Sequence, residues 1–249
     1  DDFPIIPKIE KDDSFSIEAN KLVAGIGSVA YAAALSDMKP EISSVYIYTE
    51  SDELIFVATD SFRLAEKRVQ NQQKDKKMSI ILPFKNANEL ARIFEQSSEI
   101  LDVYFNKNQI SVVSPTVYFT SRLVGGIFPD YKQIIPKEKK TELVVLKKDL
   151  IDSIKISNIF SDKLNQINIK VSLEDALFEI SSKNQDRGES ATSIPATIEG
   201  ESVDVTVNAK YILDCLQSIS SDSVHIVLNG QNKPIIIKGI GGGNSFLYL

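Results

Sequence analysis

The sequence predicts an α+β fold in which one structural unit is used twice in tandem. Four segments carry apolar residues at helical spacing, and the stretches between them are rich in β-branched and aromatic residues. The same order of segments recurs in the two halves of the 249-residue chain. Apolar residues make up 43% of the chain and charged residues 25%, so it can bury a core beneath a solvated surface.

Each predicted helix repeats its apolar side chains three or four positions apart. In the first, Leu22, Ile26 and Val29 fall on one face. Asn86 and Asn208 stand at the start of the second and fourth helices, where each can act as an N-cap. The four predicted helices span residues 16–35, 86–96, 147–160 and 208–219.

The predicted strands are short and separated by polar or glycine-containing turns, such as residues 50–52 and Asn229-Gly230. In the first half they cover residues 45–48, 54–57, 103–105, 110–112 and 118–120. In the second half they cover residues 167–171, 176–180, 203–207, 224–228, 235–237 and 246–249.

The two halves align at nearly constant offsets. Residues 45–56 match residues 167–178, and Asn86 matches Asn208 at the same offset. The first helices match at a slightly larger offset, with Leu22 on Leu150, and the difference falls in a predicted loop at residues 36–40.

This alignment predicts the domain organisation. A linker is expected around residues 129–140. We predict a linker from an N-terminal neighbour at residues 1–13, one domain at 14–131 and a second, with its C-terminal end truncated, at 132–249. Because the pattern breaks off inside a strand, we expect the chain to be a fragment.

The composition excludes most kinds of catalytic and metal-binding site. The chain has one cysteine, Cys215, and one histidine, His225, which are too few for a Cys/His zinc site; we expect both to be packing residues. No disulfide can form within the chain, which favours a reducing compartment.

The net charge of −6 argues against nucleic-acid binding through a basic surface. No apolar run approaches the ~20 residues that span a bilayer. We expect no catalytic residue, metal or cofactor.

Two glycine motifs favour structural roles. Gly25 and Gly27 lie inside the first predicted helix, where they cannot form a phosphate-binding turn, so we expect them to allow a neighbour to approach closely. Residues 239–243 join two strands and predict a hairpin loop.

The segment at residues 59–65 follows a strand and combines a carboxylate, a hydroxyl and a guanidinium. No histidine accompanies them, so a Ser–His–Asp relay is not available there. Taken alone, the segment is more typical of a strand end at which Asp60 caps a turn.

Four motifs resemble those of one family, the bacterial DNA polymerase III β subunit, or sliding clamp. Residues 58–65, ATDSFRLA, resemble its A-T-D-G-H-R-L-A, and residues 119–131 resemble F-x-S-x-L-x-x-G-x-F-P-D-Y. Residues 208–214 resemble N-x-x-Y-L-x-D, and residues 233–237 resemble K-P-v-l-I. The motifs occur in the family's order and cover essentially the whole chain as the second and third of three clamp domains.

The resemblance implies a DNA-clamp fold, with two helices packed on antiparallel sheets in each domain. It implies a non-enzymatic, cytoplasmic, nucleoid-associated processivity factor of bacteria. Two full-length chains would close around duplex DNA without reading its sequence, and the ring would tether the polymerase, the clamp loader and repair factors. We expect the fragment alone to be monomeric.

The resemblance also implies a cleft that binds short apolar peptides of partner proteins. The matching positions are Thr59, Ser61, Phe62, Arg63, Leu64, Pro129, Gln133, Ile134, Asn208, Tyr211 and Pro234, with Lys39 and Ile42 as weaker matches. Ser61-Phe62 replaces the family's common Gly-His, which predicts a bulkier, more apolar pocket floor. Gln133 stands where a basic residue is frequent, and Pro40-Glu41 replaces aromatic residues that can touch DNA.

The helices predicted to face DNA carry as many acidic as basic residues, six of each, so they form no basic stripe. The basic residues proposed to face DNA are Lys21, Arg92, Lys148, Lys155 and Lys210. Two alternatives stay open: a hydrolase using the Asp60 carboxylate with a second acid, and a repeat scaffold with no role on DNA.

Overall fold

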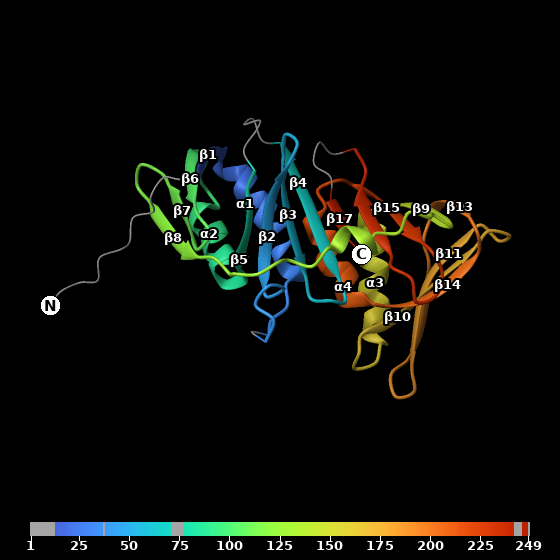
Figure 1. Ribbon diagram of the computed structural model, residues 1–249. Helices are drawn as coiled ribbons and strands as arrows, with labels where there is room; N and C mark the ends of the chain where they lie inside the picture. The colour runs from blue at the N-terminus through green and yellow to red at the C-terminus, as the bar shows by residue number, and fades with distance from the viewer. Residues whose placement is uncertain (1–12, 37, 71–76, 242–245, 249) are drawn as a thin grey trace. The chain divides into compact units, whose positions relative to one another are not determined.

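The computed structural model describes residues 13–36, 38–70, 77–241 and 246–248, which belong to two compact units. Unit 1 comprises residues 1–129 and unit 2 residues 130–249, and each is described by itself (Figure 1). None of the described helices combines the length and the apolar character that a membrane span requires.

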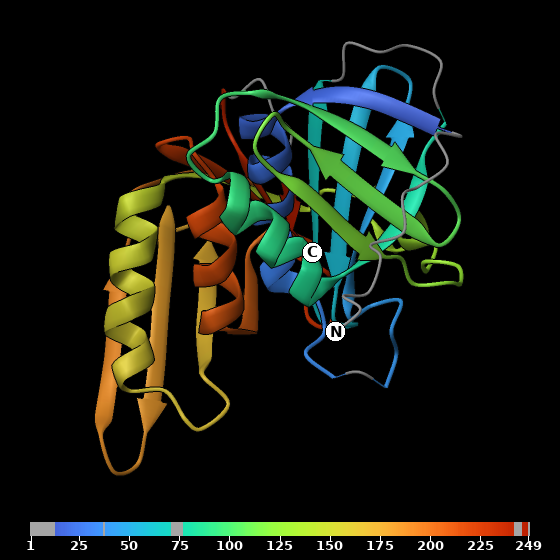
Figure 2. The same cartoon turned by 90° about the vertical axis from the view of Figure 1, so that its left-hand side faces the viewer.

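The described residues of unit 1 form two four-stranded antiparallel arrays and two α-helices. The arrays have the strand orders β1-β6-β7-β8 and β5-β2-β3-β4. Helices α1 and α2 contact one another, and Figure 2 shows them beside the strands. The elements are β1 Asp13–Glu18, α1 Ala19–Gly27, the 3-10 helix η1 Ala30–Ala32, β2 Ser44–Glu50, β3 Glu53–Thr59, β4 Leu64–Gln70, β5 Ser79–Pro83, α2 Phe84–Phe94, β6 Ile100–Phe105, β7 Gln109–Val113 and β8 Tyr118–Arg122.

Unit 2 is built in the same way. Its arrays have the orders β12-β11-β10-β14 and β13-β9-β15-β16-β17, and α3 contacts α4 as well as β11 and β12 (Figure 2). The elements are the 3-10 helix η2 Tyr131–Ile134, β9 Thr141–Leu146, α3 Lys147–Ile159, β10 Gln166–Ser172, β11 Leu177–Asn184, β12 Gly188–Ser193, β13 Ala196–Gly200, β14 Val203–Asn208, α4 Ala209–Ser218, β15 Ser223–Leu228, β16 Ile236–Gly239 and β17 Phe246–Tyr248.

The element order confirms the α+β fold with a duplicated unit. Each unit runs strand, helix and strands, then strand, helix and strands again. The first strand of each half-unit pairs with the strands of the other half: β1 pairs with β6, and β5 pairs with β2. Unit 2 repeats this exchange, since β9 pairs with β15 and β14 pairs with β10.

The alignment of the two halves is confirmed in part. The match of Leu22 with Leu150 holds, because each lies at the fourth position of its helix, α1 or α3. The match of residues 45–56 with 167–178 holds for β2 and β10 but fails beyond them. The β2–β3 turn joins Glu50 to Glu53, whereas the β10–β11 turn, from Ser172 to Leu177, is longer.

Because of this longer turn, residues after β2 correspond to residues further along unit 2 than the constant offset predicts. Phe56 pairs with Ile47 on β2, and the corresponding pair in unit 2 is Ile180 with Ile169. Phe56 therefore corresponds to Ile180 and not to Phe178. The N-cap that corresponds to Asn208 is Pro83, so the prediction that Asn86 caps α2 is wrong.

The first predicted helix begins too early and ends too late. Residues 16–18 belong to β1, where Phe15 and Ile17 alternate with more exposed residues and lie in the core. Alternation with a period of two is typical of a half-buried strand. Helix α1 ends at Gly27, and only η1 follows it. The sequence pattern also missed β4, β5, β9, β12 and β13.

Cys215 is buried in α4, as expected. His225 is instead half-buried on β15, where its Nε2 lies 2.8 Å from Oε2 of Glu142. Lys139, 3.0 Å from the same oxygen, is the main cause of a lowered pKa of Glu142, and His225 adds to it. His225 thus contacts a partly exposed carboxylate and does not belong to the core.

Candidate functional site

The turn between β3 and β4 is held by side chains of its own residues. Thr59 pairs with Leu64 across the two strands, and the Thr59 hydroxyl donates to the Arg63 carbonyl over 2.7 Å. One oxygen of the Asp60 carboxylate, Oδ1, accepts the backbone N–H of both Phe62 and Arg63 at 2.9 Å. These bonds allow Ser61 to adopt a φ of 78°, a left-handed backbone conformation that residues other than glycine rarely adopt. The turn is therefore fixed despite its backbone strain.

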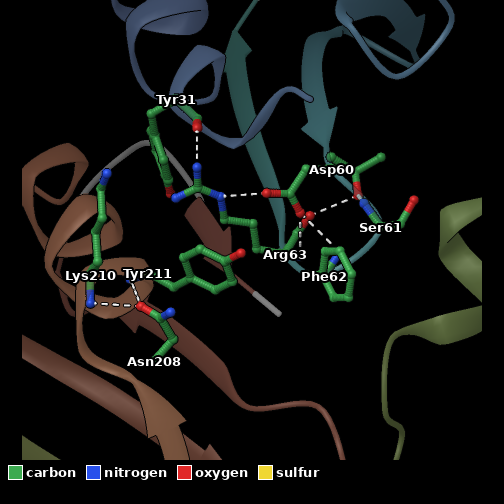
Figure 3. Close-up of polar contacts among 9 residues, drawn as sticks. Tyr31, Asp60, Ser61, Phe62, Arg63, Asn208, Lys210 and Tyr211 are labelled. Carbon is green, nitrogen blue, oxygen red and sulfur yellow. Dashed lines mark hydrogen bonds and ion pairs between the residues drawn. The ribbon is translucent and has the colours of Figure 1, made fainter. Parts of the chain in front are cut away.

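Arg63 connects this turn to the segment after α1. Its Nε donates to Asp60 Oδ2 over 3.0 Å, and its Nη2 donates to the Tyr31 carbonyl over 2.7 Å (Figure 3). The guanidinium also lies over the Tyr31 ring, 5.5 Å from its centroid. The Arg63 and Asp60 side chains are only 11% and 16% exposed. Because the two opposite charges are paired, the turn offers no uncompensated charge to a ligand.

The predicted site residues of unit 1 differ in exposure. The Phe62 side chain is 81% exposed, whereas Leu64 is 1% exposed and Thr59 is also buried. Lys39 is exposed in the loop before β2, and its carbonyl accepts the backbone N–H of Ile42, which is buried. Phe62 is thus the large apolar side chain that this turn exposes to solvent.

In unit 2, Asn208 acts as the N-cap of α4, as predicted. Its Oδ1 accepts the backbone N–H of Lys210 at 2.9 Å and of Tyr211 at 3.2 Å (Figure 3). Its Nδ2 donates to the Leu164 carbonyl. This cap fixes the first turn of α4, from which the half-buried Tyr211 projects. Pro234 is exposed in the loop before β16.

The linker residues predicted for the site differ from their neighbour Phe128 in exposure. Gln133 and Ile134 are exposed, as is Pro129, and Gln133 Nε2 donates to Asp130 Oδ2 over 2.6 Å. In unit 1, Phe128 is buried and stacks on Tyr46 with ring centroids 4.8 Å apart.

The structure brings the predicted positions 59 and 61–64 together in one turn, and Asn208 with Tyr211 at one helix terminus. The prediction that Asp60 caps a turn is confirmed, because its carboxylate accepts two backbone N–H groups of that turn. Sequence reasoning missed Tyr31 as a partner of Arg63. Nothing in the sequence pointed to Tyr31, since its hydrogen bond to Arg63 uses a backbone carbonyl.

The basic residues proposed to face DNA lie on the four helices, as predicted. Two are paired with nearby glutamates: Lys21 with Glu18 at 2.6 Å, and Arg92 with Glu89, whose pKa is lowered by the hydrogen bond from Arg92. Lys148, Lys155 and Lys210 are exposed on α3 and α4. Pairing further reduces the positive charge available to phosphates.

The hydrolase alternative finds little support in this geometry. Both Asp60 oxygens accept hydrogen bonds, from Phe62, Arg63 and the Arg63 guanidinium, so the carboxylate already has a structural role. Among the described residues, no group of three or more His, Cys, Asp or Glu side chains is placed to hold a metal ion.

Two family models match consecutive parts of the chain. The model described as DNA polymerase III beta subunit, central domain, matches residues 16–130. The model described as DNA polymerase III beta subunit, C-terminal domain, matches residues 132–245. Together they cover both units in order.

Two curated proteins are similar to this chain over almost its whole length. The beta sliding clamp of Staphylococcus epidermidis is 29% identical over 239 residues, which are 96% of this chain and 63% of the relative. That of Staphylococcus aureus is 29% identical over 242 residues, 97% of this chain and 64% of the relative. The chain thus spans less than two thirds of the length of these curated relatives.

Solved structures agree in fold. The DNA polymerase sliding clamp of Bacillus subtilis superposes with a TM-score of 0.93 at 27% identity, covering 99% of this chain and 66% of that one. The DNA polymerase III beta subunit of Thermotoga maritima gives a TM-score of 0.92 at 26% identity, covering 100% and 67%.

Proposed function

We propose that this chain, which belongs to the DNA polymerase III beta subunit family, forms the central and C-terminal domains of a sliding clamp. The clamp is a non-catalytic processivity factor: it encircles duplex DNA in the cytoplasm and holds the replicative polymerase, the clamp loader and other partners on it. The observation that most supports this is the order of the two family matches, which account for both units of the chain in sequence.

The mechanism is topological and does not depend on affinity for DNA. The net charge is −6, and two of the five basic helix residues proposed to face DNA are paired with glutamates. Phosphate neutralisation by clustered Lys and Arg is what gives ordinary DNA binders their affinity. A closed ring needs little of that affinity, because the DNA leaves only when the ring opens or when a free end passes through it.

Partner capture is proposed to use the predicted peptide-binding cleft. In unit 1 the proposed anchor is the exposed Phe62 of the β3–β4 turn, and in unit 2 it is Tyr211 at the capped start of α4. Aromatic side chains on fixed backbone are common anchors of binding energy, because they bury a large area at a low cost in conformational entropy. The partner segment is a short peptide with apolar side chains.

The experiment is a fluorescence-anisotropy titration of the chain with a fluorescein-labelled peptide from the C-terminal tail of the replicative polymerase. We expect saturable micromolar binding that weakens about tenfold in Tyr211→Ala, as is typical of aromatic anchors. Tyr118→Ala is the matched control, because Tyr118 is 47% exposed on β8, outside the predicted site. Leu64→Ala is a poorer probe, since Leu64 is buried and its loss destabilises unit 1. Equal affinities for the Tyr211 and Tyr118 variants, or no binding by the unmodified chain, contradict the cleft.

A further inference from the structure

We infer that Asp60 is a positioning residue for partner binding: its carboxylate holds the β3–β4 turn in the one conformation that presents Phe62 to a bound peptide. This inference rests on the proposed function, because it concerns the same cleft. It adds a residue that the family resemblance did not place in the cleft, and it assigns a role to the carboxylate that the hydrolase alternative would have used for catalysis.

The first argument is the number of bonds that converge on this carboxylate. Oδ1 accepts hydrogen bonds from the backbone N–H groups of Phe62 and Arg63, and Oδ2 accepts one from the Arg63 Nε–H. The Asp60 backbone N–H also donates to the Arg63 carbonyl at 3.3 Å. Residues 60–63 are therefore closed into a loop in which this carboxylate accepts three hydrogen bonds, in addition to the two that the Thr59 hydroxyl makes.

The second argument is that the turn has an unfavourable backbone conformation. Ser61 has a φ of 78°, and its N–H is bonded to the Thr59 hydroxyl at 3.1 Å. A non-glycine residue in this region persists only where surrounding bonds enforce it, and such residues cluster at ligand sites. Without the Asp60 carboxylate, Ser61 is free to return to a more common conformation, which redirects the next residue, Phe62.

The third argument is the contrast between the fixed backbone and the exposed side chain of Phe62. Its N–H is bound to Asp60, yet its ring is 81% exposed. The two charges of the turn itself, on Asp60 and Arg63, neutralise each other. An aromatic ring on a fixed, charge-neutral turn suits an apolar side chain of the partner, since ordering it costs little on binding.

The size of the effect follows from population arithmetic. When only a fraction of the molecules holds the binding-competent conformation, the apparent dissociation constant rises by the inverse of that fraction. If loss of the carboxylate leaves the turn competent about one tenth of the time, the affinity falls about tenfold.

The test is a double-mutant cycle in the same peptide titration, with Asp60→Ala, Phe62→Ala and the double variant. We expect Asp60→Ala to weaken binding of the fluorescein-labelled polymerase-tail peptide about tenfold, and Phe62→Ala by a similar factor. If Asp60 acts through Phe62, Asp60→Ala adds less than a twofold loss in the Phe62→Ala background. Its effect on the melting temperature of unit 1 is expected to be the same in both backgrounds.

Asp60→Asn is the conservative control. Its amide oxygen can still accept the Phe62 and Arg63 N–H groups, and asparagine forms this type of turn readily, so binding should recover to within about threefold of the unmodified chain. A purely structural role predicts losses that follow the melting temperature and remain undiminished when Phe62 is absent.

The outcomes separate this inference from the proposed function. If the unmodified chain binds and Tyr211→Ala weakens binding, but Asp60→Ala does not, the inference fails and the cleft stands. Additive losses in the cycle also overturn the inference. If the unmodified chain does not bind at all, the cleft and the inference fail together.

Discussion

Gly200→Ala is expected to destabilise unit 2 by about 4 kcal/mol, of which ~1–3 kcal/mol is the cost of the backbone conformation. Gly200 closes β13 at a φ of 108°, a conformation that is essentially confined to glycine. A Cβ there would overlap the Lys140 carbonyl oxygen and lie 3.0 Å from Thr141 Cα. These are backbone atoms, so no side-chain rotation relieves the clash. That carbonyl also accepts the Glu201 N–H at 3.0 Å, a bond that any displacement would break.

Urea unfolding followed by far-ultraviolet circular dichroism measures this loss. Gly230→Ala is the matched control: Gly230 has a similar φ of 102°, but an added Cβ meets nothing within 4 Å. The control should lose only the conformational part, about 1–3 kcal/mol. Equal losses in the two variants would show that the close contact at Lys140 is not present in solution.

Gly25→Ala is expected to destabilise unit 1 by about 2 kcal/mol, although alanine is the better helix former by ~1 kcal/mol. An added Cβ would overlap Cε2 of Phe56 and lie 2.5 Å from its Cζ. The Phe56 side chain on β3 is fully buried, so its ring cannot turn out into solvent. Inserting a methyl group into such a core forces strained rotamers or a shift of the helix.

Gly27→Ala, two residues along the same helix, is the control for the helix propensity. Its Cβ would meet nothing within 4 Å, so this variant should gain up to about 1 kcal/mol of stability. The same unfolding measurement tests both variants, and a stabilised Gly25→Ala would mean that α1 does not lie so close to Phe56. The two glycines therefore share a motif but not a role: only Gly25 permits the close approach that the sequence predicted for both.

The α+β class and the duplication could be predicted because they depend on local patterns. Leu22 and Ile26, or Ile212 and Cys215, repeat at helical spacing whatever surrounds them. The start of α1 could not be placed, because Ile17 and Leu22 fit a helix as well as a strand followed by a helix. What decides between them is the pairing of β1 with β6, a strand that follows much later in the chain.

The offset between the halves failed where a turn changed length. The longer β10–β11 turn displaces everything after it, yet β-rich sequence tolerates a shift by an even number of positions because it keeps the same alternation of faces. Phe56 and Phe178 therefore aligned by sequence without occupying equivalent positions. The asparagine match failed for a related reason: α2 begins after Pro83, which stands at the N-cap without a side-chain hydrogen bond.

The peptide-binding role of the candidate site stays a prediction, and the sequence anticipated only part of its local geometry. Phe62 and Tyr211 are assigned to the site through motifs, whereas most of the hydrogen bonds around them depend on the folded backbone, which the motifs do not describe. Asn208 capping α4 was within reach of sequence reasoning, because asparagine before an apolar periodic segment is a standard cap signal. The contact between Arg63 and the Tyr31 carbonyl was not, since it joins residues 32 positions apart through a backbone atom.

The central claim is topological, and retention on DNA tests it most directly. The clamp loader first loads the full-length protein that contains this chain onto nicked circular plasmid, and half of the sample is then linearised. Gel filtration then measures how much protein stays with each form of the DNA. A ring is expected to remain with the circular DNA at salt concentrations that remove ordinary phosphate-bound proteins, and to be lost from the linear DNA by sliding off its ends. Equal retention on both forms, or release from both as salt rises, would contradict a clamp.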